Sequence, residues 1–302
     1  MRDVITVAFS TFREARFKWV IELLRSLDTQ SMNDFKIVVV VDKNKQYYER
    51  LADAVEKETA IKCRTNVIFN PVDKGIAHSR NIALSHSETP YIAYTDDDAI
   101  PDHLWLEKLL RTLKLNKKVV AATGPVLCKW ETGTENYSSW FPKELYWIVG
   151  CTPWHIADIA EVRNGFASNL GFKREVLLEC GGFSEKFGYN PLNPISGEEP
   201  EIGIRLAKSG YITLWNPDVV VYHRVSEERL KIRSILARCF LEGKTKAYLH
   251  RIYGRKAINF EADYLQTLFK SSVETRSFRS KAVILLTIAM VFSGYLIYSF
   301  KS

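Results

Sequence analysis

The sequence is poor in cysteine, glycine and proline, and this scarcity limits the classes of protein it can be. Five cysteines are scattered among 302 residues, an odd number without a Cys-x-x-Cys pair. This argues against a zinc site or a disulfide framework and favours reduced thiols in a protein that faces the cytosol. With 15 glycines, 10 prolines and no internal repeat or low-complexity tract, nothing indicates long disorder. The N-terminus enters an apolar run at once, without the pattern of a signal peptide.

The remaining composition is that of a globular protein, 46% hydrophobic and 25% charged. The length allows one large α/β domain or two small ones. The net charge of +7 suits a nucleic acid, an anionic membrane or a phosphorylated substrate. Because no nucleic-acid-binding motif is present and the cations gather before an apolar tail, we expect no nucleic-acid partner.

The apolar tail, residues 282–300, is 19 residues long and carries no charge. As a helix it would measure roughly 28 Å, close to the hydrocarbon thickness of a bilayer. A buried C-terminal helix is the alternative. We expect a single transmembrane helix at 281–301 in the cell membrane, and the basic residues before it place the catalytic body on the cytoplasmic side.

A basic, helical segment precedes this tail, within residues 227–280. Between residues 229 and 256 it has nine positively charged residues and a single acidic residue, Glu242. This favours an amphipathic helix against anionic headgroups. A solvated charged face is the alternative.

Strands and helices alternate through residues 1–226, which we expect to form one catalytic domain with halves at 1–124 and 125–226. Strands are predicted at 4–9, 35–41, 66–69, 91–95, 119–124, 212–215 and 219–222. Helices are predicted to end near 27 and to span 47–58, 76–85, 104–115, 174–180 and 196–209. The alternation predicts an α/β fold, a mostly parallel sheet with helices on both faces.

Acidic residues stand where the predicted strands end: Asp42 after one, and Asp96, Asp97 and Asp98 after another. Ligands of such sheets bind beyond the carboxyl ends of the strands, so one crevice would gather these side chains. Alternation along the chain puts Asp96 and Asp98 on the same side. A solvated turn capping a helix that starts at Pro101 is the alternative.

Residues 125–163 lose the alternation and are rich in aromatic residues. These rings would form core, a sugar-stacking surface or a membrane-contacting flap. The rings are Trp130, Tyr137, Trp140, Phe141, Tyr146, Trp147 and Trp154.

An ordered set of motifs resembles the family-2 glycosyltransferases with the GT-A fold. The resemblance covers residues 4–250. It is carried by Ser10-Thr11-Phe12-Arg13-Glu14, Val39-Val40-Val41-Asp42, the segment 70–81, Asp96-Asp97-Asp98, Gly181-Gly182-Phe183, and Gly197-Glu198-Glu199 with Arg205.

The resemblance implies roles for the matching residues. Those that would bind the nucleotide are Thr11, Arg13, Glu14, Asp42, Asp73, Arg80 and Asp96. Asp96 and Asp98 would also hold Mg²⁺ or Mn²⁺, with His223 as a further metal or phosphate contact. Glu199 would be the catalytic base, although the choice between Glu198 and Glu199 stays open. Metal neutralises the departing pyrophosphate, and the base takes the proton of the acceptor hydroxyl.

Three positions depart from the family pattern. Lys43 stands where a second Asp usually follows Asp42, which puts base recognition in doubt. The catalytic base is more often Asp than Glu, and Pro200 after it is unusual, although it suits a first helical turn.

The expected function is therefore metal-dependent, inverting glycosyl transfer from a nucleotide sugar to a lipid-linked acceptor, a polyprenyl or dolichyl phosphate or a glycolipid. A UDP-sugar is the first expectation and a GDP-sugar stays open. The alternatives are a nucleotidyltransferase, a non-catalytic sugar-binding module, and a polysaccharide or protein glycosylation enzyme with a non-lipid acceptor. The missing glycine in Ser10–Glu14 counts against the nucleotidyltransferase. The oligomeric state stays open.

Overall fold

The computed structural model describes residues 4–57, 59–188 and 195–300. The chain forms two compact units. Unit 1 comprises Met1–Leu127, His155–Pro191 and Glu198–His223, and unit 2 comprises Cys128–Trp154, Leu192–Gly197 and Arg224–Ser302. This outline differs from the domains expected from the sequence, because segment 128–154 packs with the C-terminal helices.

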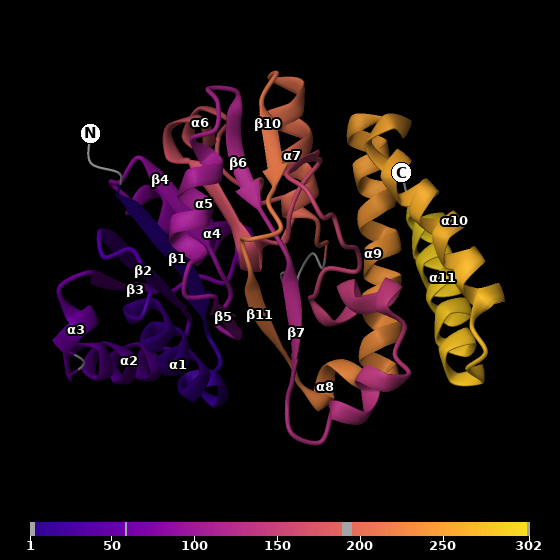
Figure 1. Ribbon diagram of the computed structural model, residues 1–302, viewed down its shortest axis with the longest axis horizontal. Helices are drawn as coiled ribbons and strands as arrows, with labels where there is room; N and C mark the ends of the chain where they lie inside the picture. The colour runs from indigo at the N-terminus through magenta and orange to yellow at the C-terminus, as the bar shows by residue number, and fades with distance from the viewer. Residues whose placement is uncertain (1–3, 58, 189–194, 301–302) are drawn as a thin grey trace. The chain divides into compact units, whose positions relative to one another are not determined.

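Unit 1 is built on an eight-stranded sheet with the order β3-β2-β1-β4-β9-β6-β10-β8. Figure 1 labels β1 to β4, β6 and β10 of this sheet. Its strands are β1 (Ile5–Thr11), β2 (Phe35–Asp42), β3 (Thr65–Asn70), β4 (Tyr91–Tyr94), β6 (Val119–Thr123), β8 (Ala160–Val162), β9 (Leu170–Lys173) and β10 (Ile212–Trp215). Four of the pairings are parallel, whereas β9 runs antiparallel to β4 and β6, and β8 to β10. The expected α/β fold with a mostly parallel sheet is confirmed.

Helices cover both faces of this sheet, as strands buried on both sides require. One apolar core joins β1 and β2 to α1 (Phe17–Asp28), α2 (Lys45–Lys57) and α5 (Trp105–Leu113). The other joins the opposite sides of these strands to α4 (Ile76–Ser85), α6 (Arg174–Glu179) and α7 (Glu198–Lys208). Short helices η1 (Glu14–Arg16), α3 (Thr59–Lys62) and η4 (Ala167–Asn169) complete the unit.

A second sheet of three strands has the order β5-β11-β7. The strands are β5 (Ala99–Pro101), β7 (Val126–Trp130) and β11 (Val221–Val225). The sequence prediction was wrong here for one strand. The predicted strand 219–222 starts and ends later, so His223 lies inside β11 and not after it. Pro101 ends β5 and does not start a helix, which rules out the alternative in which the acidic residues before it cap one.

Unit 2 contains the aromatic segment and the C-terminal helices. The helices are η2 (Glu135–Ser139), η3 (Lys143–Val149), α8 (Glu227–Leu230), α9 (Ile232–Tyr253), η5 (Arg255–Ile258), α10 (Asn259–Glu274) and α11 (Phe278–Ser299). Phe141, Leu145 and Ile148 form a core with Ile235 and Ile284, and most of the expected aromatic rings pack against it. These rings belong to the core of unit 2.

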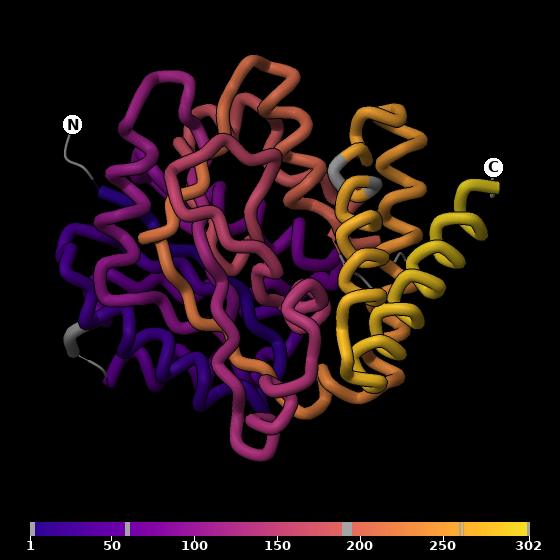
Figure 2. Tube along the Cα trace, turned by 45° about the vertical axis from the view of Figure 1, so that its right-hand side comes forward, coloured from indigo at the N-terminus to yellow at the C-terminus, as the bar shows by residue number. Residues whose placement is uncertain are grey.

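The last three long helices lie beside one another at the orange-to-yellow end of the trace (Figure 2). Among the described residues, α11 is the one helix long and apolar enough to cross a membrane. A Cβ atom on Gly294 would lie 2.1 Å from the carbonyl oxygen of Phe240, and one on Gly243 would lie 1.9 Å from that of Val291. Glycine is therefore required at both positions for α9 and α11 to approach this closely.

The basic face expected of segment 229–256 is only partly present. Lys244 and Lys246 are buried inside unit 2. Lys246 Nζ lies 2.8 Å from Glu242 Oε1 and 2.9 Å from Glu261 Oε1, and Lys244 Nζ lies 4.6 Å from the centre of the Tyr298 ring. These two cations therefore stabilise helix packing and do not face solvent.

Replacing Gly294 with leucine should force α9 and α11 apart, because the new side chain meets backbone atoms that cannot move alone. We expect a loss of about 2 kcal/mol or more in the free energy of unfolding, at the upper range for overpacked sites. Ala289, exposed on the same helix, is the matched control, and Ala289→Leu should change stability by less than about 0.5 kcal/mol. Thermal unfolding of the full chain in detergent measures both. Equal stability of the two variants would contradict this helix contact.

Candidate active site

The three consecutive aspartates lie in a tight turn between β4 and β5. The backbone N–H of Thr95 donates to the carbonyl of Ala8 on β1 at 3.1 Å, and that of Ala99 donates to the carbonyl of Asp96 at 3.0 Å. Asp96 and Asp98 therefore lie after the strand, and the turn, not the expected strand alternation, determines where their side chains point.

Asp97 points into the protein and is only 4% exposed. One of its carboxylate oxygens pairs with the guanidinium of Arg16, and the other accepts a hydrogen bond of 2.7 Å from Thr11 Oγ1. Burial raises the pKa of Asp97 to about 6, although Arg16 acts in the opposite direction. Thr11, expected to line the nucleotide pocket, is itself buried, and its hydroxyl also lies 3.1 Å from Tyr47 Oη. Thr11 and Asp97 therefore hold the turn in place.

Asp96 and Asp98 turn instead toward His223. One ligand atom from each of the three lies within 4.8 Å of the others. Because His223 pairs with Ala99 across β5 and β11, its Nε2 comes within 3.2 Å of Asp98 Oδ1. The second oxygen of Asp98 lies 3.1 Å from Nη2 of Arg16.

This group has the composition of a divalent-cation site. Carboxylate oxygens are the ligands that Mg²⁺ and Mn²⁺ prefer, and Mg²⁺ is usually held by only one or two of them. His223 Nδ1 is buried without a hydrogen-bond partner among the described residues, so that ring is not fixed from its other side. The residues present therefore fit a metal ion held by Asp96 and Asp98, with His223 beside them.

Arg80 connects this group to the start of α7. It lies on α4 and is almost completely buried. Its Nη1 lies 2.7 Å from Glu198 Oε1 and its Nη2 lies 3.7 Å from Asp96 Oδ1. A buried arginine between two carboxylates balances their charge and fixes their positions.

Glu199 stands in the first turn of α7, next to Glu198. Its Oε1 accepts a hydrogen bond of 3.2 Å from the backbone N–H of Ala167 in η4. Burial, and secondly the charge of Glu198, raise the pKa of Glu199 to about 7, against the effect of Arg80. Glu199 as a whole residue is half-buried. A carboxyl group with this pKa can accept a proton near neutral pH.

The antiparallel direction of β9 explains how η4 reaches this place. Leu170, the first residue of β9, pairs with Tyr94, the last residue of β4. The N-terminal end of β9 thus meets the C-terminal ends of the parallel strands, and Thr95 Oγ1 donates to the carbonyl of Ser168 at 3.0 Å.

Asp42 lies at the same edge, at the end of β2. Asn70 Nδ2 donates to its carboxylate at 2.6 Å, and Ser79 Oγ lies 2.8 Å from both oxygens. Burial raises the pKa of Asp42. Lys43, which departs from the family pattern, forms an ion pair with Asp73. Asp73, which was expected to contact the nucleotide, therefore already has a charged partner.

Arg13 and Glu14 are not gathered into this group. Both side chains are exposed. The Arg13 guanidinium stacks over Phe12 at 5.1 Å, and Glu14 pairs with Arg50 on α2 at 2.8 Å. In this structure they are surface residues that follow the C-terminal end of β1.

Sequence reasoning missed several residues that organise the site. Arg16 belongs to no recognised motif, and nothing local indicated its partner 81 residues away. Asn70 and Ser79 lie in the segment 70–81 that was singled out, but their common partner, Asp42, was not foreseen. Only the packing of β2, β3 and α4 brings these three residues together.

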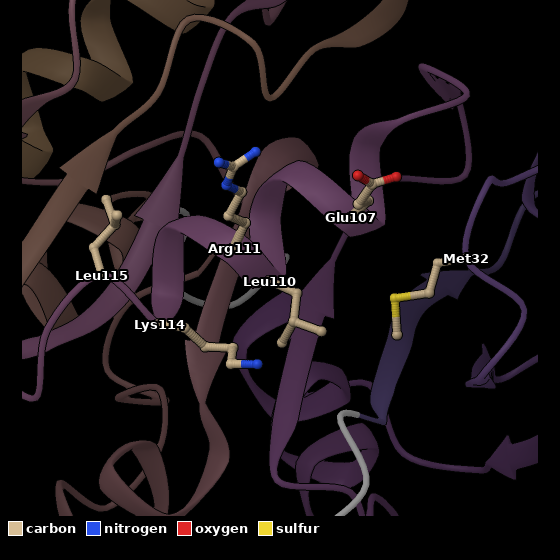
Figure 3. A pocket seen from close by; sticks show the side chains of 6 residues that line it. All are labelled: Met32, Glu107, Leu110, Arg111, Lys114 and Leu115. Atoms are coloured by element: carbon tan, nitrogen blue, oxygen red, sulfur yellow. The ribbon is translucent and has the colours of Figure 1, made fainter.

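A separate hollow on unit 1 shares no residue with this site (Figure 3). It lies along α5 and the residues just beyond it. Its lining consists of Met32, Glu107, Leu110, Arg111, Lys114 and Leu115.

Comparison with known families identifies the class of protein to which this acidic site belongs. Residues 6–181 match the glycosyl transferase family 2, and the chain belongs to this family. It is therefore a glycosyltransferase.

Among individual relatives, the chain is 28% identical over 268 residues to a glucosyl-dolichyl phosphate glucuronosyltransferase of Haloferax volcanii, covering 87% of this chain and 82% of the relative. It is 25% identical over 228 residues to a pre-mycofactocin glycosyltransferase of Mycobacterium tuberculosis, covering 75% of this chain but only 44% of that protein.

A solved structure shares the fold. It is a mannosyltransferase from Pyrobaculum calidifontis in complex with GDP-mannose and Mn²⁺. Its TM-score is 0.53 at 19% identity, over 98% of this chain and 82% of that one.

The structure predicts different metal roles for neighbouring aspartates. Asp98→Asn should weaken Mn²⁺ binding about 100-fold or more, because a ligand charge is lost. Asp97→Asn is the comparison variant and should weaken it by only about tenfold, because this side chain supports the turn and is not placed as an ion ligand. Electron paramagnetic resonance of Mn²⁺ titrated into each purified variant measures this without turnover, and Mg²⁺ competition compares the two ions. Equal losses in both variants would contradict the assignment of Asp98.

Proposed function

We propose that this glycosyltransferase moves a sugar from a nucleoside diphosphate sugar to a lipid-linked acceptor, with inversion at the anomeric carbon and with Mg²⁺ or Mn²⁺ bound. The observation that carries the proposal is the buried Arg80, which contacts Asp96 on the metal side and Glu198, the neighbour of Glu199, on the other. One buried arginine thus connects the proposed metal ligands with the proposed catalytic base, and such a reaction needs both.

The donor would lie along the carboxyl ends of β1, β2 and β4. Asp42, held by Asn70 and Ser79, offers a fixed acceptor for N–H or hydroxyl groups of the nucleoside. Lys43 and Asp73 lie beside it. UDP-sugar is the first expectation, and GDP-sugar is the alternative that a donor screen decides.

Asp96 and Asp98, with His223, would hold the cation against the diphosphate. When bound, a divalent ion neutralises the negative charge that develops on the departing diphosphate. Asp96 would in addition reach the ribose. Arg16 keeps Asp98 in position through its contact at 3.1 Å.

Glu199 would take the proton from the acceptor hydroxyl as that oxygen attacks the anomeric carbon. Between the two neighbouring glutamates, Glu198 is bound by Arg80 at 2.7 Å, whereas Glu199 accepts a hydrogen bond from the backbone N–H of Ala167, has no arginine contact at this distance among the described residues, and is only half-buried. We therefore assign the base to Glu199. The bond to the diphosphate breaks as the new bond forms, so one direct displacement inverts the sugar.

A lipid-linked acceptor at the cytoplasmic face of the membrane is supported by the apolar helix α11 and by the relative that acts, by its name, on glucosyl-dolichyl phosphate. A non-lipid acceptor remains the competing proposal. Nucleotidyl transfer loses its support because the chain belongs to a glycosyltransferase family.

A donor screen tests the reaction. With Mn²⁺ present, we expect one UDP- or GDP-sugar to be transferred to a polyprenyl phosphate or a polyprenyl-linked sugar. Glu199→Gln should lower kcat by about 10²- to 10⁴-fold, since general base catalysis is lost, while donor binding changes little. Product analysis by mass spectrometry and donor binding by calorimetry provide the measurements.

The matched control is Glu175→Gln, an exposed glutamate on α6 that should leave kcat unchanged. Full activity of Glu199→Gln would remove this residue from the mechanism. Transfer to a soluble glycan or peptide, but to none of the lipids, would overturn the acceptor class and keep the reaction.

The raised pKa of Glu199, about 7, also predicts a pH profile. A base must be ionised to act, so kcat should fall roughly tenfold for each pH unit below this value and level off above it. Rates measured at saturating donor concentration exclude pH effects on donor binding, to which the titration of Asp42 would contribute. A kcat that stays constant from pH 5.5 to 8 would contradict the assignment.

A further inference from the structure

The helix α11 has two unlike faces. The face that packs inside unit 2 holds small and polar residues, including Ser280, Thr287 and Gly294, all buried. Ser280 Oγ donates to the carbonyl of Trp140 at 2.6 Å, and Cys239 Sγ lies 3.7 Å from Thr287 Oγ1.

The opposite face exposes large apolar side chains to the surroundings. These are Phe278, Leu285, Leu286, Phe292, Leu296, Ile297 and Phe300. On the neighbouring helix α10, Phe269 and Val273 are exposed as well, Val273 by 76%. This many exposed apolar side chains on one face of a helix indicate a binding surface.

Along its inner face α11 is accompanied by α9. The contacts start at Cys239 with Thr287, pass the crossing of Gly243 and Gly294, and reach Lys244 on the Tyr298 ring. The residue numbers of the contacts rise together in both helices, so the two helices run in the same direction and pack side by side.

The helix α9 carries charge on both sides of this crossing. Lys246 is paired with Glu242 and Glu261 inside the unit, and Arg238, next to Cys239, lies on the exposed surface. If α11 crossed the bilayer in this arrangement, Arg238 and the ion pairs of Lys246 would lie at the depth of the hydrocarbon. Ionised side chains at that depth are costly and rare.

We infer that α11 does not span the membrane but lies in the interface of one leaflet, with its exposed apolar face among the acyl chains and α9 on its water side. The partner is thus a lipid surface with anionic headgroups. Arg276, Arg279 and Lys281, at the start of α11, and the exposed cations of α9 are suited to those headgroups. This inference replaces the expected single-pass topology and rests on the proposed membrane location, not on the proposed reaction.

The two topologies differ in where the C-terminal end of α11 lies. An interfacial helix leaves it on the same side as unit 1, whereas a spanning helix moves it across. Ser299 is exposed at this end, and Cys63 is an exposed cysteine of unit 1. A cysteine introduced by Ser299→Cys therefore reports one side, and the native Cys63 reports the other.

The experiment uses the full chain expressed in bacterial membranes and sealed inside-out vesicles, treated with a membrane-impermeant, high-mass maleimide. Wild-type protein provides the labelling pattern with Cys63. We expect S299C to gain one further mass shift without detergent, to the same extent as with detergent. A further shift that appears only after detergent would show that α11 spans and would overturn the inference.

A second variant tests the lipid-facing side without relying on labelling. Phe292→Glu places a charge on the exposed apolar face, and we expect it to release most of the protein into the soluble fraction. Ala237→Glu, exposed on α9, is the matched control and should stay with the membrane. If wild type is recovered in the soluble fraction, the membrane surface itself is overturned, while glycosyl transfer remains measurable on detergent-solubilised acceptor. Retention of both variants would also contradict the interfacial position.

Discussion

The ion pair between Arg16 and Asp97 is the interaction on which the rest of the site depends. It buries one of three adjacent carboxylates against a cation and a hydroxyl group, and so decides which way the turn after β4 faces. A buried carboxylate needs such partners, because its charge is otherwise too costly away from water. With Asp97 fixed inward, Asp96 and Asp98 are left to face His223. The proposed cation site is thus shaped by a structural contact on the other side of the turn.

The mixed direction of the sheet has a comparable effect. If all strands ran parallel, η4 would lie at the opposite edge from the acidic turn. The antiparallel strand β9 brings Ala167 and Ser168 to this edge, where the first contacts Glu199 and the second Thr95. Arg80 then ties the start of α7 to the turn. The proposed base and the proposed metal ligands come from elements about 100 residues apart, held by one buried guanidinium.

Unit 2 follows a different principle, close backbone packing. Gly243 and Gly294 let α9 and α11 approach until an added Cβ would collide with a carbonyl oxygen. This contact joins a charged helix to an apolar one, so the pair combines the charged side of α9 with the apolar side of α11. The inferred interfacial position follows from that combination, and an enzyme acting on lipid-linked sugars would be brought to the surface where such acceptors lie.

The sequence by itself determined the α/β fold, the family, the acidic group at the strand ends and the apolar tail, because these depend on local periodicity and on motifs of adjacent residues. The helix 76–85 and the strand 212–215 were predicted with the bounds that α4 and β10 have. Tertiary structure alone decided the partners of Asp97, Asp42 and Glu198, the place of His223 within β11, and the burial of Lys244 and Lys246. It also placed the charged helix α9 beside the apolar helix α11. Contacts between residues far apart in the chain leave no local pattern, so only the packing of strands and helices reveals them.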